Sequence, residues 1–447
     1  MKTVGFRSIV LYILLAVFIG GVGYLVANMF LHGRQWVMQP YNAHLSGQMG
    51  DIKDRDGNLL ATSQDGGRVY SENDTVRRAL LHTIGDTAGF IGTGVQSVMG
   101  DKLTGYNFIT GLNDTVFSRM GSGLTLTVSQ DACTAAYNAM AGRNGAAILY
   151  NYENGDILCK VSAPTFDPAF VPEDIETNDA YKGAYLDKSL SASFTPGSIF
   201  KIITAAAAME KWPDSWSERT YECWGAENIG GSDITCLHGE AHGSQDMFAA
   251  MGNSCNIYFA HLANDIGGGA LQKKAEEMGF NQSFDFNGVN VTKSTLDLTG
   301  ANANQIGWAA VGQYTVLANP YHMMVLMGAV AKGGSYTQPR LTESGDFLSK
   351  VIKPEKLMSS ETARQLKALL RSDVENYYGD WMFPQGMAVC AKTGTGEVGE
   401  GKAPNCWMVG FCDSAQYPYA FAVVVEEGEG GIETAGVLVN AMLQALA

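Results

Sequence analysis

The amino-acid sequence predicts an α+β protein with an N-terminal transmembrane helix, a small mixed domain, and a larger domain in which an antiparallel sheet is flanked by helices. Three observations predict this architecture. An unbroken stretch without formal charge, 8–33, stands near the N-terminus. Strand-like runs occur at both ends of the later part of the chain, and a long, Ala-rich, mainly helical block, about 194–331, lies between them. We therefore expect one sheet that is built from both ends and covered by helices.

Length and composition limit the class of protein. The chain has 447 residues, enough for two or three domains with a sizeable core. Thirty Lys and Arg against 45 Asp and Glu give a net charge of −15, which disfavours a nucleic-acid partner because phosphate binding needs a basic face. Apolar residues make up an ordinary 46%, so one or two membrane spans at most are expected.

The apolar segment 8–31 is expected to cross a membrane, since about 20 apolar residues suffice for a span. Lys2 and Arg7 precede it, which predicts that residues 1–7 stay in the cytoplasm and that the rest of the chain lies outside. A cleaved signal peptide is the alternative. The run is long for a signal peptide, and no small-residue cleavage site follows it. The sequence thus predicts a single-pass protein of the cell membrane with an extracytoplasmic body.

Local patterns predict the remaining elements. Residues 51–61 are typical of two strands joined by a Gly turn. Ser129 is expected to cap a helix that ends at Met140. The next strands are predicted at 145–150 and 156–161, joined by an Asn-Gly turn as a β-hairpin. Three more strands are expected at 389–394, 407–411 and 419–425, followed by a helix over 432–447. These elements predict a stalk and small domain at 32–142 and the larger domain at 143–447.

The eight cysteines fall into two groups. Six lie in or beside apolar runs and are expected to be small core residues: Cys133, Cys159, Cys255, Cys390, Cys406 and Cys412. Cys223 and Cys236 bracket a Gly-rich loop, so a disulfide between them and two free thiols are equally open. A metal cluster of Cys236 with His238 and His242 is disfavoured, because no second Cys-x-x-Cys and no zinc-helix Glu accompany it. No metal and no cofactor are expected.

One short motif combines a nucleophile with a base. It reads Thr195-Pro196-Gly197-Ser198-Ile199-Phe200-Lys201. Pro and Gly end the preceding segment, and the Ala-rich run that follows is helical in composition. Ser198 should therefore lie in the first turn of a helix, where backbone N–H groups stabilise negative charge, with Lys201 on the same face. A lysine can activate a serine only if burial or neighbouring cations keep the lysine neutral.

Two further motifs follow in the chain. They are Ser254-Cys255-Asn256 and Lys392-Thr393-Gly394-Thr395. The last is not a phosphate-binding loop, because Ala391 rather than Gly precedes the lysine. Gly394 on a predicted strand allows close approach of a ligand. Each motif alone is a weak signal, but the three together, in this order and at this spacing along the chain, are specific.

With these motifs the chain resembles the penicillin-recognising serine enzymes, and among them the short class B penicillin-binding proteins, which are monofunctional peptidoglycan D,D-transpeptidases. The resemblance covers nearly the whole chain after the apolar segment. It is also carried by residues 54–57, 60–61, 155–158, 162–168 and 312–313 and by Glu426. It implies a membrane anchor, a pedestal domain at 32–142, and a transpeptidase domain at 143–447 with the fold of the serine β-lactamases.

The resemblance also implies a role for each motif residue. Ser198 would be acylated by the penultimate D-Ala of a stem peptide that ends in D-Ala-D-Ala, with Lys201 as the base and release of terminal D-Ala. Ser254 would relay the proton toward the leaving amine, supported by Lys392. The substrate-binding residues would be Asn256, Thr393, Gly394 and Thr395. The backbone N–H groups of Ser198 and Thr395 would form the oxyanion hole.

The expected partners follow from the same resemblance. They are peptidoglycan stem peptides, β-lactams as acylating inhibitors, the lipid bilayer, and a glycan polymerase of the SEDS family. A β-lactamase, which must add a base that activates water for deacylation, and a β-lactam-sensing receptor are the alternatives on the same fold. Roles in cell elongation, division and sporulation are all compatible with the sequence.

Overall fold

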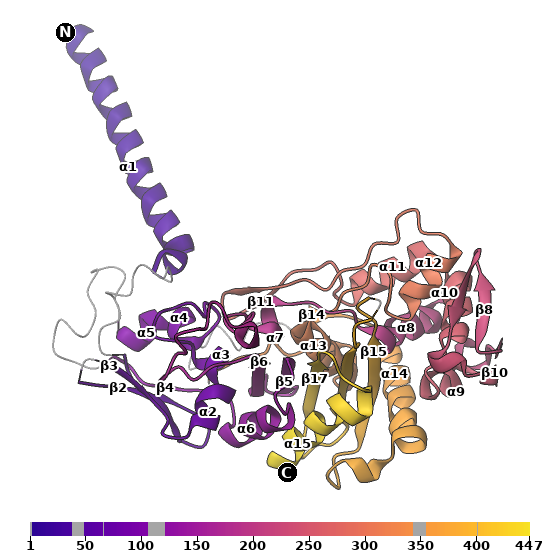
Figure 1. Ribbon diagram of the computed structural model, residues 1–447. Helices are drawn as coiled ribbons and strands as arrows, with labels where there is room; N and C mark the ends of the chain where they lie inside the picture. Colours follow the sequence, from indigo (N-terminus) through magenta and orange to yellow (C-terminus); the bar gives the residue numbers. More distant parts are fainter. Residues whose placement is uncertain (1, 38–48, 66, 106–120, 343–354, 400) are drawn as a thin grey trace.

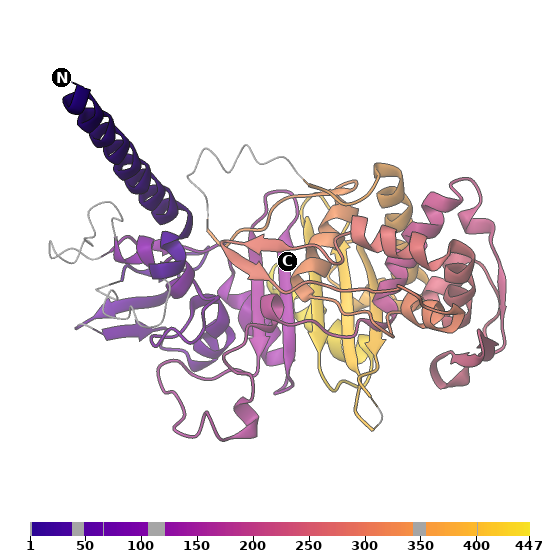
Figure 2. The same ribbon diagram turned by 90° about the horizontal axis from the view of Figure 1, so that it is seen from above.

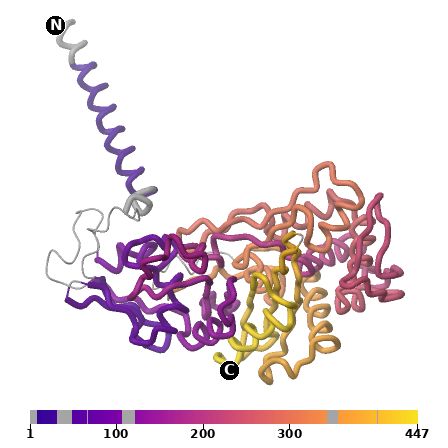
Figure 3. Tube along the Cα trace, viewed as in Figure 1, coloured from indigo at the N-terminus to yellow at the C-terminus, as the bar shows by residue number. Residues whose placement is uncertain are grey.

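The computed structural model describes residues 2–37, 49–65, 67–105, 121–342, 355–399 and 401–447 (Figures 1 and 3). Helix α1 (Lys2–Val37) projects away from the rest of the molecule in two perpendicular views (Figures 1 and 2). Its segment Ser8–Leu31 is long and apolar enough to cross a membrane, and none of it is buried in the protein. A signal sequence near an N-terminus can also meet this criterion of length and apolar composition. The helix expected at 8–31 is therefore present.

A four-stranded sheet forms the core of the N-terminal part. Its strand order is β3-β2-β1-β4, and β1 pairs parallel with β4 whereas the other neighbours are antiparallel, which makes it a mixed sheet. The elements are β1 (Ile52–Lys53), β2 (Leu59–Gln64), β3 (Gly67–Tyr70), α2 (Asp74–Ala79), α3 (Leu81–Ile84), α4 (Val95–Val98), α5 (Gly100–Thr104) and β4 (Leu124–Thr125). The predicted turn is built by Asp54, whose carboxylate accepts the backbone N–H groups of Asp56 and Asn58. Gly57 supplies the positive φ of 87° in that turn.

A five-stranded antiparallel sheet organises the larger part of the protein. Its order is β15-β16-β17-β5-β6, so the pairing of β17 with β5 joins the end of the chain to the hairpin near residue 150. The strands are β5 (Gly145–Asn151), β6 (Ile157–Ala163), β15 (Val389–Gly396), β16 (Asn405–Cys412) and β17 (Tyr419–Val425). The predicted hairpin, the three C-terminal strands and the closure of one sheet by both ends are all confirmed.

Helices cover both faces of this sheet. On one face α6 (Gln130–Ala139) contacts β6 and α15 (Val437–Ala445), and α15 also contacts β17. Ser129 caps α6 as expected, since its hydroxyl accepts the N–H of Ala132 at 3.3 Å. On the other face α13 (Pro320–Ala331) contacts β5, β16 and β17. The predicted C-terminal helix begins later than expected, because a π-helical turn at Gly431–Gly436 precedes α15.

The block between the two halves of the sheet is helical but also contains short strand pairs, which the sequence did not predict. The helices are α7 (Lys188–Ser191), α8 (Lys201–Lys211), α9 (Met247–Gly252), α10 (Asn256–Ile266), α11 (Gly268–Glu277), α12 (Ala303–Ala310) and, beyond α13, α14 (Ser360–Asp373). The strand pairs are β7 (Tyr221–Cys223) with β10 (Gly243–Gln245), β8 (Ala226–Ile229) with β9 (Ser232–Thr235), β11 (Phe284–Phe286) with β12 (Val289–Val291), and β13 (Ser335–Tyr336) with β14 (Glu355–Lys356). Figure 1 shows β8, β10, α9 and α10 together at one end of the molecule.

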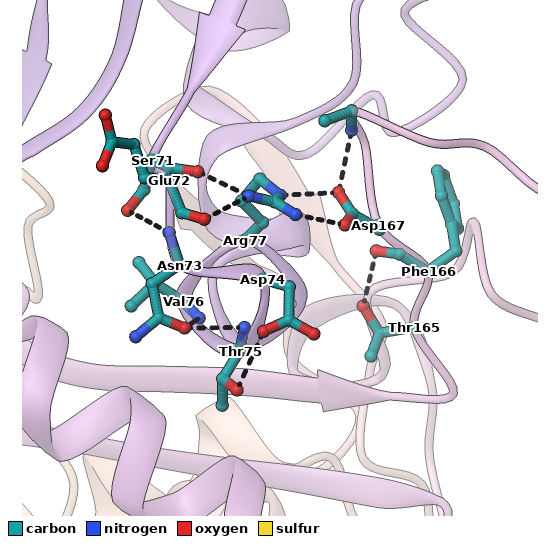
Figure 4. Close-up of polar contacts among 11 residues, drawn as sticks. Ser71, Glu72, Asn73, Asp74, Thr75, Val76, Arg77, Thr165, Phe166 and Asp167 are labelled. Atoms are coloured by element: carbon teal, nitrogen blue, oxygen red, sulfur yellow. Dashed lines mark hydrogen bonds and ion pairs between the residues drawn. The ribbon is translucent and has the colours of Figure 1, made fainter.

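A largely buried ion pair joins the N-terminal part to the larger part (Figure 4). The guanidinium of Arg77, on α2, donates to both carboxylate oxygens of Asp167, with Nε–Oδ1 at 2.8 Å and Nη2–Oδ2 at 2.6 Å. Its Nη1 donates to the carbonyls of Ser71 and Glu72. Burial alone would raise the pKa of Asp167, but the hydrogen bonds from Arg77 and Ala169 hold it below its usual value. The two parts are thus fixed to each other by a bidentate contact as well as by apolar packing.

Candidate active site

Ser198 and Lys201 lie where a 3-10 turn, Gly197–Phe200, runs into α8. Gly197 has a φ of 56°, and a Cβ at that position would lie 2.2 Å from the carbonyl oxygen of Thr395. Only glycine therefore lets the turn pack against β15. Ser198 is half-buried, whereas the side chain of Lys201 is fully buried. The nucleophile candidate thus stays accessible while the base candidate is removed from water.

The second motif meets Lys201 directly. Lys201 Nζ donates to the hydroxyl of Ser254 at 3.1 Å, to the Ser254 carbonyl at 2.5 Å and to Oδ1 of Asn256 at 2.8 Å. Asn256 begins α10, and Cys255 caps that helix with its sulfur, which accepts the N–H of Tyr258 at 3.4 Å. Ser254 has a positive φ of 52°, a conformation that a non-glycine residue adopts only when its surroundings impose it. Here the contacts of Lys201 and the cap of α10 impose it.

The third motif lies on β15, the edge strand of the sheet. Lys392 Nζ lies 3.4 Å from Oγ of Ser254, so this hydroxyl contacts the amines of both Lys201 and Lys392. A Cβ on Gly394 would approach the carbonyl oxygen of Pro196 to 2.5 Å, which brings the edge strand against the first motif. Thr393 and Thr395 are half-buried at the same edge. The three motifs, which are far apart in the sequence, thus form one cluster.

The electrostatics of this cluster favour a neutral Lys201. Burial, and after it the positive charge of Lys392, lower the pKa of its amine to about 7. The amine lies 5.5 Å from the centre of the Phe259 ring. Near neutral pH, Lys201 can therefore accept a proton from a hydroxyl, which an ordinary exposed lysine cannot do.

Two residues outside the motifs complete the cluster. The hydroxyl of Tyr378 lies 3.1 Å from Lys392 Nζ and 3.1 Å from Thr393 Oγ1, and it accepts the Thr393 N–H at 3.2 Å. Asp373, at the end of α14, is fully buried, and within the described residues neither of its carboxylate oxygens has a hydrogen-bond partner. Burial raises its pKa to about 7, against the opposing effect of Lys392 and Lys201. Neither residue belongs to a short motif, so no local pattern pointed to them.

The structure also shows the state of Cys223 and Cys236, for which the sequence allowed either a disulfide or two free thiols. The sulfur atoms of Cys223 and Cys236 are 3.6 Å apart, against about 2.05 Å in a disulfide, and both cysteines are free thiols in this structure. The six cysteines expected in the core are all buried, including Cys255 in the middle of the second motif. His238, the other candidate ligand weighed in the sequence, is not in the group that the structure brings together, which consists of Cys223, Cys236, His242 and Cys255.

Comparison with known proteins gives a family. Residues 145–444 match the model of the penicillin binding protein transpeptidase domain. The chain belongs to this family. It is 28% identical over 307 residues to Stage V sporulation protein D of Bacillus subtilis, a match that covers 65% of this chain and 46% of that protein. It is 26% identical over 350 residues to the peptidoglycan D,D-transpeptidase PbpA of Mycolicibacterium smegmatis, covering 71% of this chain and 70% of that protein.

Solved structures of penicillin-binding proteins share the fold. The D,D-transpeptidase domain of a peptidoglycan glycosyltransferase from Eggerthella lenta is 25% identical with a TM-score of 0.74, covering 90% of this chain and 98% of that one. Penicillin-binding protein A from M. tuberculosis, in a ceftriaxone acyl-enzyme complex, is 23% identical with a TM-score of 0.78, with coverages of 90% and 98%. The α+β transpeptidase fold expected from the sequence is therefore confirmed. This chain spans about half the length of the Bacillus subtilis relative.

Proposed function

We propose that this penicillin-binding protein is a peptidoglycan D,D-transpeptidase that cross-links stem peptides through an acyl-enzyme on Ser198. The observation that carries the proposal is the position of Lys201. Its amine is buried one helical turn after the candidate nucleophile, hydrogen-bonded to the hydroxyl of Ser254, and its pKa is lowered to about 7 by burial and by Lys392. These are the conditions under which a lysine serves as the base of an acyl transfer.

The acylation step would move one proton around this cluster. Lys201 takes the proton from Ser198 as its oxygen attacks the carbonyl carbon of the penultimate D-Ala. The peptide C–N bond breaks, and the proton passes through the hydroxyl of Ser254 to the leaving amine of terminal D-Ala. Lys392, 3.4 Å from that hydroxyl, orients the relay and adds positive potential. Attack by an amine from a second stem peptide then forms the cross-link and restores the free Ser198 hydroxyl.

The edge strand β15 would hold the substrate. Gly394 lets the peptide backbone approach, while the hydroxyls of Thr393 and Thr395 take the terminal carboxylate. Backbone N–H groups of Ser198 and Thr395 stabilise the oxyanion, where loss of one donor typically costs about 3 kcal/mol of barrier. Asn256 contacts the substrate amide. Before substrate arrives, its Nδ2 donates to the carbonyl of Thr235 at 2.8 Å and its Oδ1 accepts from Lys201.

The remaining parts of the chain would place this reaction at the outer surface of the cell membrane. We propose a cytoplasmic segment at 1–7, an anchor at 8–31, a stalk and pedestal at 32–142 and the transpeptidase domain at 143–447. The length and composition of α1 support the anchor. A glycan polymerase of the SEDS family is the proposed partner of the anchor and pedestal, because cross-linking needs newly made glycan strands beside it.

A stem-peptide exchange assay tests the proposed reaction. Full-length protein in detergent is incubated with a stem pentapeptide ending in D-Ala-D-Ala and a labelled D-amino acid as acceptor. We expect release of D-Ala and a product with the label at its terminus. Ser198→Ala should abolish both, and Ser232→Ala, on the exposed strand β9, should not. Rapid penicillin hydrolysis without peptide exchange would favour a β-lactamase, and penicillin binding with neither activity would favour a receptor. Both outcomes would overturn the proposal.

A further inference from the structure

Four side chains with metal-binding atoms converge behind the second motif. Cys223 ends β7, Cys236 follows β9, His242 precedes β10, and Cys255 caps α10. Their three sulfur atoms and one imidazole nitrogen all lie within 4.8 Å of one another. The three cysteines are buried and the histidine is half-buried. None of the four takes part in the acyl transfer described above, so the cluster needs a separate explanation.

The distances fit a tetrahedral metal site. In a zinc site with Zn–S of about 2.3 Å and Zn–N of about 2.1 Å, neighbouring sulfurs are about 3.8 Å apart and sulfur and nitrogen about 3.6 Å. Here Cys223 Sγ lies 3.6 Å from Cys236 Sγ and 3.4 Å from His242 Nδ1, and Cys236 Sγ lies 3.9 Å from Cys255 Sγ. The other edges do not exceed 4.8 Å, so no edge has to shorten by more than about 1.2 Å to close the tetrahedron.

A disulfide explains this arrangement less well. Cys236 has one sulfur neighbour at 3.6 Å and another at 3.9 Å, both well beyond the bonding distance of about 2.05 Å. A disulfide from Cys236 to either sulfur would not account for the position of the third thiol or of His242. A metal uses all four groups at once. Three thiolates and one imidazole form a donor set that is typical of structural zinc, and they leave no coordination position open for water.

We propose that Cys223, Cys236, His242 and Cys255 bind one Zn²⁺ ion in a closed tetrahedral site. Binding displaces the protons of the three thiols, so three thiolates and Zn²⁺ together carry one negative charge. The sequence disfavoured a metal because no second Cys-x-x-Cys and no zinc-helix Glu accompany Cys236 and His242. The ligands instead come from two short strand pairs and a helix cap, which bring together positions that are well separated in the chain.

The ion would hold the wall of the active site. Cys255 lies between Ser254 and Asn256, so a metal on its sulfur fixes the backbone from which both motif side chains project. The other three ligands belong to segment 221–245, which contains the strand pairs β7–β10 and β8–β9. This segment already contacts the second motif, because Asn256 Nδ2 donates to the carbonyl of Thr235. The N–H of Tyr258 donates to the sulfur of Cys255, as backbone amides do around zinc thiolates. Zinc is thus a positioning element and takes no part in the acyl transfer.

Metal analysis tests the proposal directly and without an activity assay. The full-length chain, purified in detergent with a non-thiol reductant and without a polyhistidine tag, should contain about one zinc per chain. Cys236→Ser should lose the metal, and His242→Ala, at the half-buried ligand, should lower its content. Cys133→Ser is the matched control, because Cys133 is equally buried but lies in α6, outside the cluster. Cobalt in place of zinc should give the intense visible bands of a tetrahedral thiolate complex.

Removal of zinc from the wild-type chain with a chelator tests the proposal even if the Cys236 variant does not fold. Removing zinc from the wild-type chain should lower its melting temperature and slow its acylation by penicillin, and added Zn²⁺ should restore both. Three results would overturn the proposal. They are wild-type protein with no bound zinc, a different stoichiometric metal such as iron or copper, and peptide mapping that finds a disulfide within the cluster in protein purified without reductant. The exchange assay on Ser198 is independent of all three.

Discussion

Two regions of the protein bury lysine side chains, but only one of them pairs the lysine with a carboxylate. On β6, Lys160 Nζ lies 2.5 Å from Oδ2 of Asp187, and both side chains are at most 1% exposed. In the active site, Lys201 and Lys392 are buried to the same degree, but within the described part of the chain neither forms an ion pair with a carboxylate. Their amines contact hydroxyl, carbonyl and amide oxygens instead.

The presence or absence of a carboxylate partner distinguishes a lysine that stabilises the fold from a lysine that can act as a base. Burial by itself would raise the pKa of Asp187, but Lys160 and His82 hold it below its usual value, so the carboxylate stays charged and the pair stays fixed. Lys201 lacks such a partner and loses its proton near pH 7. A buried lysine with a carboxylate holds parts of the fold together, whereas a buried lysine beside another lysine can exchange a proton.

Replacement of Lys201 should have the largest effect on the chemistry. Lys201→Met removes the base but keeps the length of the side chain, so acylation by penicillin should slow by about 10³- to 10⁴-fold. The melting temperature should stay close to the wild-type value, because a desolvated amine is replaced by apolar atoms. Stopped-flow or gel-based acylation rates and thermal melting measure the two quantities. Normal acylation in this variant would mean that another base acts.

Replacement of Lys160 should have the opposite profile. Lys160→Met leaves the carboxylate of Asp187 buried without its partner, which typically costs about 3 to 5 kcal/mol of stability. The melting temperature should fall by several degrees, while the acylation rate of the folded protein changes little. Lys53→Met, at an exposed position of β1, is the control and should melt as the wild type does. An unchanged melting temperature for Lys160→Met would remove the distinction between the two regions.

Tyr378→Phe should have a smaller effect on acylation. The hydroxyl contacts Lys392 Nζ and the N–H and side chain of Thr393, so its loss leaves buried groups at the substrate strand without a partner. We expect about a tenfold slower acylation, which corresponds to about 1.4 kcal/mol. Tyr377→Phe, at the exposed neighbouring position, is the matched control. Equal rates for both variants would show that the Tyr378 hydroxyl does not support Lys392.

Asp373→Asn should have the smallest effect, visible in the pH profile. Acylation by wild-type protein should fall about tenfold per pH unit below the pKa of Lys201, about 7, because only the neutral amine accepts a proton. Where Asp373 is ionised, at about pH 7 and above, its charge raises the pKa of Lys201. Its removal should therefore speed acylation slightly near pH 7, and change it little near pH 6, where the carboxyl is already protonated. Glu375→Gln, at an exposed carboxylate, should leave the profile unchanged. A shift toward higher pH would contradict the assigned coupling.

The sequence was sufficient for the parts of the fold that carry long, regular signals. The strands at 145–163 and 389–425 have continuous apolar runs with clear turns, and the Ala-rich run after Lys201 forms α8 as expected. The short strand pairs of the helical block were missed. Gly230 and Gly231 form the two-residue turn of the β8–β9 hairpin, with φ values of 66° and 99°. A Gly-Gly pair is typical of a hairpin turn, but the flanking strands are too short to show a clear alternating pattern.

The sequence pointed to the site residues that belong to short motifs, but not to the residues that packing between distant segments brings to the site. Of the motif residues, Lys201 and Lys392 both contact the hydroxyl of Ser254. Asp373 and Tyr378 depend on how α14 and the π-helical turn after it pack against β15, which no local pattern encodes. The four candidate zinc ligands likewise depend on the register of two short strand pairs.

Mass spectrometry of the penicillin adduct tests the central claim most directly. After brief incubation with penicillin, the intact wild-type protein should gain the mass of one penicillin, and peptide mapping should locate it on Ser198. The adduct should persist for hours, and Ser198→Ala should show none. An adduct that remains in Ser198→Ala, or that maps to Ser254, would contradict the assignment of Ser198 as the nucleophile.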